Sequence, residues 1–216
     1  CWAFSNHDVM RHASRWAAGE PDGTAYLKVI SALLLSLRGS ACLYQGEELG
    51  LTEADLAFED LRDPYGIRFW PEFKGRDGCR TPMVWDGKEA NGGFSQAKPW
   101  LPVPAEHLAK AVGAQQGKAG SLLEHYRRFL AFRRAHKALV KGDIEFLDSP
   151  EDTVAFTRRE GNEQMLCAFN LGHSARTVEL GGMGSLKPVP GHGFSGQQDG
   201  TSVTLAGYQA WFAYLA

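Results

Sequence analysis

The stretch FSNHD, at residues 4–8, places an amide, an imidazole and a carboxylate side by side near the start of the chain. A carboxylate just beyond the C-terminal end of a buried parallel strand stands where α/β barrels carry catalytic groups. If residues 2–4 end such a strand, Asp8 is a candidate for that role. The alternative is structural: Asn6 or Asp8 caps a following helix, and His7 is a packing or hydrogen-bonding residue at a strand end.

A second stretch, GRDGCRTPM at residues 75–83, places Arg76 and Arg80 on either side of Asp77. The aromatic segment FWPEF, residues 69–73, precedes it. A guanidinium fork binds hydroxyl groups and an aromatic face packs against C–H patches, so the combination suits a sugar. A surface loop held by ion pairs is the alternative.

A third stretch, YQGEELG at residues 44–50, combines two glycines with two glutamates. Gly46 and Gly50 punctuate a turn, and the carboxylates of Glu47 and Glu48 are favourable at a helix N-terminus. We interpret this stretch as structural.

The predicted helices and strands around these motifs fall into three blocks of sequence. In the first, apolar residues at helical spacing predict a helix over 26–37, with possible caps at residues 22–24 and a stop at Gly39. Short apolar runs on either side, ending at Phe4 and covering 41–44, complete a strand–helix–strand pattern. This order predicts a βαβ unit in a parallel sheet.

The second block, residues 51–120, is rich in Gly, Pro, Trp and charge, and a loop region of that length is often functional. An amphipathic helix is predicted over 121–136, with arginines, Arg133 among them, on its solvent side. In the third block the period changes, and strand-like runs separated by turn residues predict a small antiparallel β-sandwich. These runs are 144–147, 153–159, 164–170, 175–180, 202–205 and 209–214.

Composition excludes several classes of function. The 216 residues carry a formal net charge of −2, so no basic surface for nucleic acid is expected. No apolar run reaches the roughly 18 residues needed to span a membrane. The four cysteines, Cys1, Cys42, Cys79 and Cys167, form no C-x-x-C pair and predict scattered reduced thiols in a cytoplasmic protein. The chain starts with Cys rather than Met, so we expect that a preceding segment has been lost.

The three motifs, in this order, resemble the C-terminal part of glycoside hydrolase family 13, the α-amylase superfamily. The similarity is greatest to bacterial α-glucosidases and oligo-1,6-glucosidases, and after about residue 140 it rests on domain architecture alone. The resemblance implies an α/β plus all-β fold. Residues 1–139 would be the C-terminal portion of a (β/α)8 barrel, with its strands seven and eight, and residues 140–216 an antiparallel β-domain.

The same resemblance implies roles for single residues. Asp8 matches the third catalytic carboxylate, which stabilises the transition state, and His7 matches a histidine that hydrogen-bonds the sugar. Arg80 matches an arginine that holds the terminal glucose, and Asn6 is expected to support the turn. No cofactor or metal is implied.

The implied activity is that of a retaining α-glucosidase acting on terminal α-linked glucose of short oligosaccharides. Such enzymes use a nucleophile and an acid/base about 5–5.5 Å apart. No segment resembles the motifs that carry these two groups, so we expect the chain to be inactive alone and to self-associate through exposed surface. The alternatives are a transferring enzyme similar to sucrose isomerase or trehalose synthase, and a non-catalytic carbohydrate-binding or regulatory module.

Overall fold

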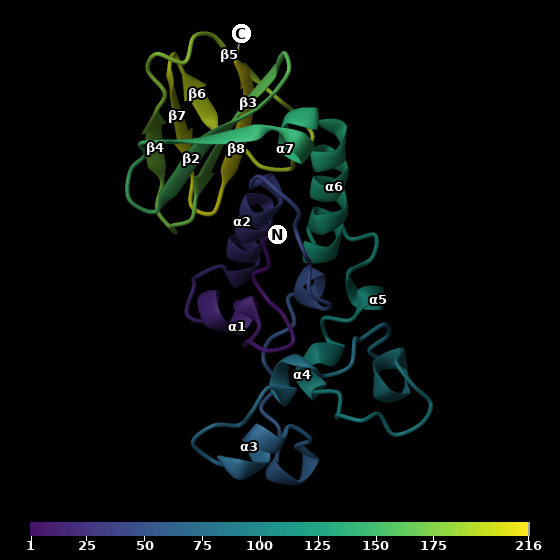
Figure 1. Ribbon diagram of the computed structural model, residues 1–216. Helices are drawn as coiled ribbons and strands as arrows, with labels where there is room; N and C mark the ends of the chain where they lie inside the picture. Colours follow the sequence, from purple (N-terminus) through teal and green to yellow (C-terminus); the bar gives the residue numbers. More distant parts are fainter. Residues whose placement is uncertain (216) are drawn as a thin grey trace. The chain divides into compact units, whose positions relative to one another are not determined.

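The computed structural model describes residues 1–215, which form a mixed α/β architecture with antiparallel sheets (Figure 1). Contacts between residues divide the chain into two compact units. Unit 1 comprises residues 1–2, 19–41 and those from 125 onward. Unit 2 comprises residues 3–18 and 42–124, and it contains all three sequence motifs.

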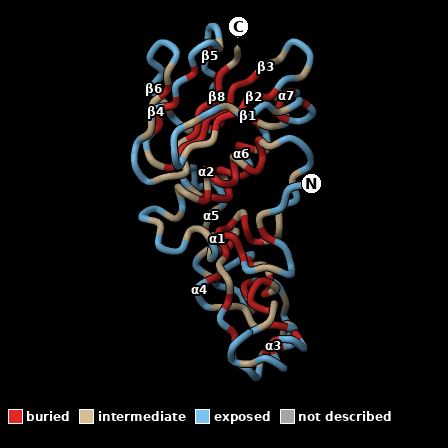
Figure 2. The backbone as a smooth tube through the Cα atoms, turned by 60° about the vertical axis from the view of Figure 1, so that its left-hand side comes forward, coloured by how far each residue is buried: buried red, intermediate tan, exposed pale blue. Residues whose placement is uncertain are grey.

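Unit 1 contains two antiparallel sheets. The larger has the order β1(Asp143–Leu147), β2(Thr153–Glu160), β3(Glu163–Asn170), β8(Ala210–Leu215), β5(Leu186–Pro188). The smaller has the order β4(Arg176–Glu179), β7(Ser202–Leu205), β6(Gln197–Asp199). Figure 2 shows buried stretches along the strands, and one apolar cluster takes residues from both sheets, among them Leu166, Trp211, Val178 and Val203.

Each of the six predicted strand runs overlaps one of these strands, with bounds that differ by one residue at most of the ends. The strands β5 and β6 were not predicted, because neither has an alternating apolar pattern. Lys187, Pro188 and all three residues of β6 are exposed. Both strands exist through tertiary pairing, β5 with β8 and β6 with β7.

The long helices agree closely with the sequence pattern. The helix α2(Gly23–Ser36) begins at Asp22, whose carboxylate accepts a hydrogen bond from the Ala25 backbone N–H at 3.0 Å. The helix α6(Leu122–Ala135) is followed by the short helix α7(Lys137–Lys141). The prediction of an N-terminal cap within residues 22–24 is therefore confirmed.

Two arginines close the C-terminal end of α2 within unit 1. Arg133 donates to the carbonyl oxygens of Leu35, Leu37 and Gly39. Arg158, which is fully buried on β2, donates to the carbonyl of Ser36 and to those at residues 142 and 143. The last carbonyls of a helix have no partner inside it, and these guanidinium groups supply one. The prediction that Arg133 lies on the solvent side of its helix is thus wrong.

The expected parallel strands are reduced to a single bridge. Trp2 and Ala41 form an isolated parallel bridge, and the Trp2 N–H donates to the Ser40 carbonyl at 2.8 Å. Trp2 is 48% exposed, so the prediction of a buried strand end is wrong for this residue. Parallel pairs are slightly less stable per residue than antiparallel ones, and two short strands without further partners make few ladder bonds.

Unit 2 consists of short helical segments around two small apolar clusters. The clusters are Leu49, Leu51, Val84, Ala111 and Leu123, and Ala54, Leu56, Leu61 and Leu101. The region 51–120, predicted as a long loop, is therefore ordered by buried side chains. The helices are α1(His12–Trp16), α3(Pro64–Arg68), α4(Ala105–Leu108), α5(Val112–Gln115) and the 3-10 turns η1(Glu47–Leu49), η2(Phe58–Asp60), η3(Asp77–Cys79) and η4(Ala90–Gly93). Across residues 1–215, no helix has the length and apolar character that crossing a membrane requires.

Candidate functional site

The FSNHD stretch forms a turn that presents Asp8. The side-chain oxygen of Asn6 accepts a hydrogen bond from the Asp8 backbone N–H at 2.8 Å, and Asn6 forms an antiparallel bridge with Val9. The following helix α1 starts only at His12. The backbone N–H of His12 donates a hydrogen bond to the Ser5 hydroxyl oxygen at 2.9 Å. Neither Asn6 nor Asp8 caps the helix, so the capping alternative is wrong.

The Asp8 carboxylate is half exposed and lies among three cationic or titratable side chains. Its Oδ1 accepts from Arg76 Nη1 at 3.0 Å and from Arg80 Nη2 at 3.2 Å. Its Oδ2 lies 3.2 Å from His7 Nε2. Arg80 also donates from Nε to the His7 carbonyl at 2.8 Å. The structure thus brings Asp8, His7 and Arg80, the three predicted site residues, into one cluster.

Arg76 also belongs to this cluster. The motif suggested sugar binding for both of its arginines, but the family resemblance assigned a role to Arg80 alone. The one-turn helix η3 separates Arg76 from Arg80, so the two arginines flank a single helical turn. That spacing of four residues is the signal that could have identified Arg76. The Arg76 guanidinium also lies over the Tyr65 ring, 5.5 Å from its centroid, which places an exposed aromatic ring beside the charge.

A buried carboxylate, Asp63, holds the far side of Arg76. Its oxygens accept from Arg76 Nε at 2.8 Å, from Arg76 Nη2 at 3.0 Å and from the Arg76 backbone N–H at 2.9 Å. The hydrogen bonds from Arg76 hold the pKa of Asp63 well below its usual range, although burial opposes this shift. The same pair raises the pKa of Arg76. Sequence reasoning missed Asp63, because it lies 13 positions before its partner.

Ion pairs do hold this loop, as the structural alternative expected, but the partners of its arginines are Asp63 and Asp8. Asp77 lies between the two arginines in sequence, but it is buried and accepts from the backbone N–H groups of Arg62 at 2.6 Å and Asp63 at 2.7 Å. A side chain at Gly66 would come within 2.6 Å of the Lys74 carbonyl, so the two ends of this loop pack backbone against backbone. The loop is therefore cross-linked, and its arginines turn toward Asp8.

The YQGEELG stretch donates hydrogen bonds to the GRDGCRTPM loop. The Tyr44 hydroxyl donates to the Cys79 carbonyl at 3.1 Å, and the Gln45 amide donates to the Thr81 carbonyl at 3.3 Å. These carbonyls belong to the two neighbours of Arg80. Gly46 and Gly50 both have positive φ, which the tight turn around η1 requires. The structural interpretation of this stretch agrees with these contacts.

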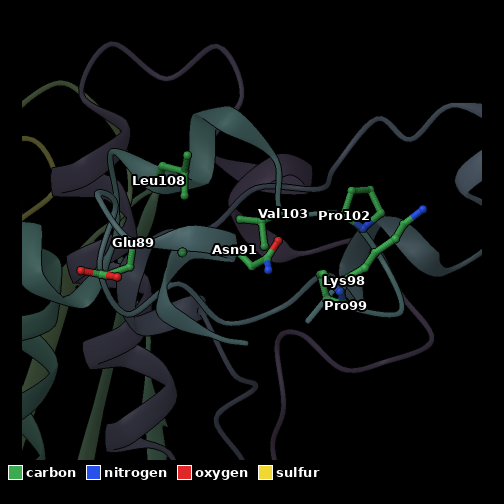
Figure 3. Close-up of a pocket in the computed structure, with 8 residues that line it drawn as sticks. Glu89, Asn91, Lys98, Pro99, Pro102, Val103 and Leu108 are labelled. Carbon is green, nitrogen blue, oxygen red and sulfur yellow. The ribbon is translucent and has the colours of Figure 1, made fainter. Parts of the chain in front are cut away.

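Unit 2 also has a separate cavity of about 310 Å³, and Figure 3 shows residues that line it. Glu89, Asn91, Lys98 and Leu108 are among its lining residues, together with Pro99, Pro102 and Val103. None of the residues in the Asp8 cluster lines it. Among residues 1–215, no group of three or more His, Cys, Asp or Glu side chains is arranged to hold a metal ion.

The Asp8 cluster has the chemistry of a site for a neutral, hydroxyl-rich ligand that develops positive charge. Guanidinium and imidazole groups donate to hydroxyls, and a carboxylate accepts from them and stabilises a cation. An aromatic ring at Tyr65 adds a surface for C–H patches.

Comparisons with known proteins agree on one family. The family model "Alpha amylase, catalytic domain" matches residues 1–142. The probable alpha-glucosidase of Rhizobium meliloti is 55% identical over all 216 residues, which cover 39% of that protein. The oligo-1,6-glucosidase of Heyndrickxia coagulans is 33% identical over 82% of this chain and 35% of its own length.

Solved structures give the same result. The alpha-glucosyl transfer enzyme XgtA has a TM-score of 0.92 and 47% identity over the whole chain, which covers 40% of XgtA. The trehalulose synthase MutB has a TM-score of 0.84 and 25% identity over 99% of this chain and 42% of its own. The chain therefore spans about two fifths of the length of these relatives.

Proposed function

The chain belongs to the alpha-amylase family, and from that premise we propose that it contributes one wall of the sugar site of a retaining α-glucosidase. The proposed substrates are short oligosaccharides or disaccharides with a terminal α-linked glucose. One observation carries the proposal: the half-exposed Asp8 carboxylate is held between Arg76 and Arg80 with His7 at its second oxygen.

In the proposed mechanism Asp8 is the catalytic residue of this chain. Retaining glycosidases pass through a transition state in which the sugar ring carries positive charge. Asp8 stabilises that charge and accepts from ring hydroxyls, while His7 and Arg80 donate hydrogen bonds that hold the terminal glucose. These groups act by preorganised electrostatics and positioning and transfer no proton.

We propose that the domains around this site are those expected for the alpha-amylase family. Residues 1–139 are the C-terminal portion of the barrel, and residues 140–216 are a β-domain of sandwich type. The parallel bridge between Trp2 and Ala41, on either side of α2, supports the first part. The apolar cluster shared by the two antiparallel sheets supports the second.

We further propose that this chain alone does not hydrolyse glucosides, because its sequence offers no match to the nucleophile and acid/base motifs of the family. The test is a chimera in which the chain replaces the matching 39% of the Rhizobium meliloti protein. The chimera should hydrolyse p-nitrophenyl α-glucoside, and Asp8→Asn should lower kcat by at least a hundredfold. The isolated chain should show no turnover.

The matched control is Asp152→Asn in unit 1, where an exposed carboxylate accepts from Arg176 at 2.8 Å. It should leave kcat unchanged. An Asp8→Asn chimera with unchanged kcat would overturn the catalytic role of Asp8. An inactive chimera, combined with maltose binding to the isolated chain in calorimetry, would favour a carbohydrate-binding module instead.

A transfer reaction is the second candidate function. It is favoured by the 47% identity to XgtA, an alpha-glucosyl transfer enzyme, and by the similarity to the trehalulose synthase MutB. Both reactions use the same Asp8 cluster and differ in whether water or a sugar hydroxyl accepts the glucosyl group. Product analysis of the chimera with sucrose distinguishes them, because the leaving group is then fructose. Equal amounts of glucose and fructose indicate hydrolysis, whereas fructose in excess over glucose together with new glucosides, or isomerised sucrose, indicates transfer.

A further inference from the structure

We propose that Asp63 is a positioning residue, which fixes Arg76 so that Arg76 in turn fixes the Asp8 carboxylate. The inference deepens the proposed function and rests on it for its kinetic consequence. The contacts that carry it lie within unit 2.

Arg76 divides its hydrogen-bond donors between two carboxylates. A guanidinium has five N–H donors in a rigid planar fork. Arg76 Nε and Nη2 point to the two oxygens of Asp63, at 2.8 and 3.0 Å, and Nη1 points to Asp8 at 3.0 Å. A bidentate pair fixes the plane of the guanidinium as well as its position. With that plane fixed, the direction of the remaining Nη1 donor is also fixed.

Asp63 is itself held by contacts with the surrounding backbone. Its side chain is completely buried, and it occupies the N-cap position of α3, where it accepts from the Tyr65 N–H at 3.2 Å. The Asp63 backbone N–H is held by the Asp77 carboxylate at 2.7 Å. Asp63 is therefore anchored at both its backbone and its side chain, whereas the Asp8 side chain is 50% exposed.

The position of the Asp8 carboxylate depends on Arg76. Asp8 sits on a turn and accepts from Arg76 through Oδ1, which leaves Oδ2 near His7. Asp63 and Asp8 thus share one arginine. The buried Asp63 carboxylate anchors Arg76, and the half-exposed Asp8 carboxylate is the group that contacts the sugar. If the anchor is lost, Arg76 can rotate, and the negative charge of Asp8 shifts relative to the sugar. Misplacement by about 1 Å can cost roughly a hundredfold in rate.

The kinetic experiment uses the chimera described above. Asp63→Asn should lower kcat roughly tenfold to a hundredfold. In an Arg76→Gln background the same change should have almost no further effect on kcat, because Asp63 acts through Arg76. The matched control is Glu53→Gln, which removes a carboxylate that accepts from the Arg11 N–H at 3.1 Å and has no contact with Arg76. Its effect should be the same in both backgrounds. Equal effects of Asp63→Asn in both backgrounds would overturn the inference.

A second measurement needs no activity. In NMR spectra of the isolated chain, the Arg76 Nε–H should exchange slowly with water, and Asp63→Asn but not Glu53→Gln should make it fast. Slow exchange in Asp63→Asn would overturn the inference even if the chimera were active. An inactive chimera with the expected exchange pattern would instead contradict the proposed function and leave the positioning of Arg76 supported.

A third variant covers the case in which Asp63→Asn does not fold. Arg76→Lys keeps a cation beside Asp63, but one ammonium group cannot reproduce the fork that reaches Asp63 and Asp8 together. It should keep the unfolding temperature close to that of the unmodified chimera and lower kcat roughly tenfold to a hundredfold. An unchanged kcat in this variant would overturn the inference.

Discussion

Arg80 binds Asp8 across 72 positions of sequence, through Nη2 to the carboxylate at 3.2 Å, and its Nε simultaneously holds the carbonyl of the preceding His7 at 2.8 Å. One guanidinium thereby fixes both the backbone of the turn and the side chain that the turn presents. The neighbours of Arg80 are themselves held by Tyr44 and Gln45. The GRDGCRTPM and YQGEELG stretches thus act together on the FSNHD turn.

Substituting Arg80 by lysine should separate these two contacts. A lysine ammonium cannot bind the His7 carbonyl and the Asp8 carboxylate with the geometry of a fork. Loss of one charge-assisted hydrogen bond costs about 1.5–3 kcal/mol, so kcat/KM of the chimera should fall about tenfold or more, with a higher KM. Steady-state kinetics check this. Arg62→Lys, at a guanidinium that donates to the nearby carbonyls of Glu59 and Leu61, is the control and should leave both parameters unchanged.

Arg158 should be essential for stability. It is fully buried and donates to three carbonyls, at residues 36, 142 and 143. Arg158→Met keeps much of the side-chain volume but leaves these acceptors without their donors, which should lower the free energy of unfolding by about 2–4 kcal/mol. Urea unfolding of the isolated chain measures the effect. The adjacent Arg159 is exposed, and Arg159→Met should change the same quantity by less than about 0.5 kcal/mol.

Features that depend on neighbouring residues could be predicted from the sequence, and features that depend on distant partners could not. The Asp22 cap and the six strand runs depend on neighbouring residues, and they could be predicted. The grouping of Asp8, His7 and Arg80 was expected from the family resemblance that the three motifs together carry. Asp63 could not be found in this way, because nothing around it distinguishes a buried anchor from a helix cap, and it is in fact both. The strand β6 was likewise missed, because its exposed residues gain strand structure only by pairing with β7.

Unit 2 should promote self-association of the isolated chain. Phe58, Tyr65, Phe69 and Phe73 are between 43% and 57% exposed, and Tyr65 stacks on Phe69 at 6.5 Å. Removing such rings from water is favourable at about 25 cal/mol per Å² of apolar area. Light scattering should therefore show a mass above 23.7 kDa at high concentration. Phe69→Ser with Phe73→Ser should shift the mass toward the monomer, and a monomeric wild-type chain at high concentration would contradict the prediction.

Stability should fall as the solution is acidified below neutral pH, through four buried histidines. Burial lowers the pKa of His12, His107 and His192 to about 4 and that of His125 to about 3. The unfolded chain binds these protons near pH 6.5, whereas the folded chain does not, so the unfolded state holds more protons between about pH 6.5 and 4. The free energy of unfolding then rises with pH in this window, by up to about 1.4 kcal/mol per pH unit for each histidine.

The contribution of one histidine can be isolated. His125 packs on Phe129 and Phe194, and its Nε2 is hydrogen-bonded to Ser31 Oγ at 3.1 Å. His125→Gln removes the titrating group and retains a hydrogen-bonding amide. Urea unfolding at pH 7 and pH 5 should show a smaller pH dependence in this variant than in the wild type, even though its stability at pH 7 is lower. An identical pH dependence in His125→Gln and the wild type would show that His125 titrates alike in both states.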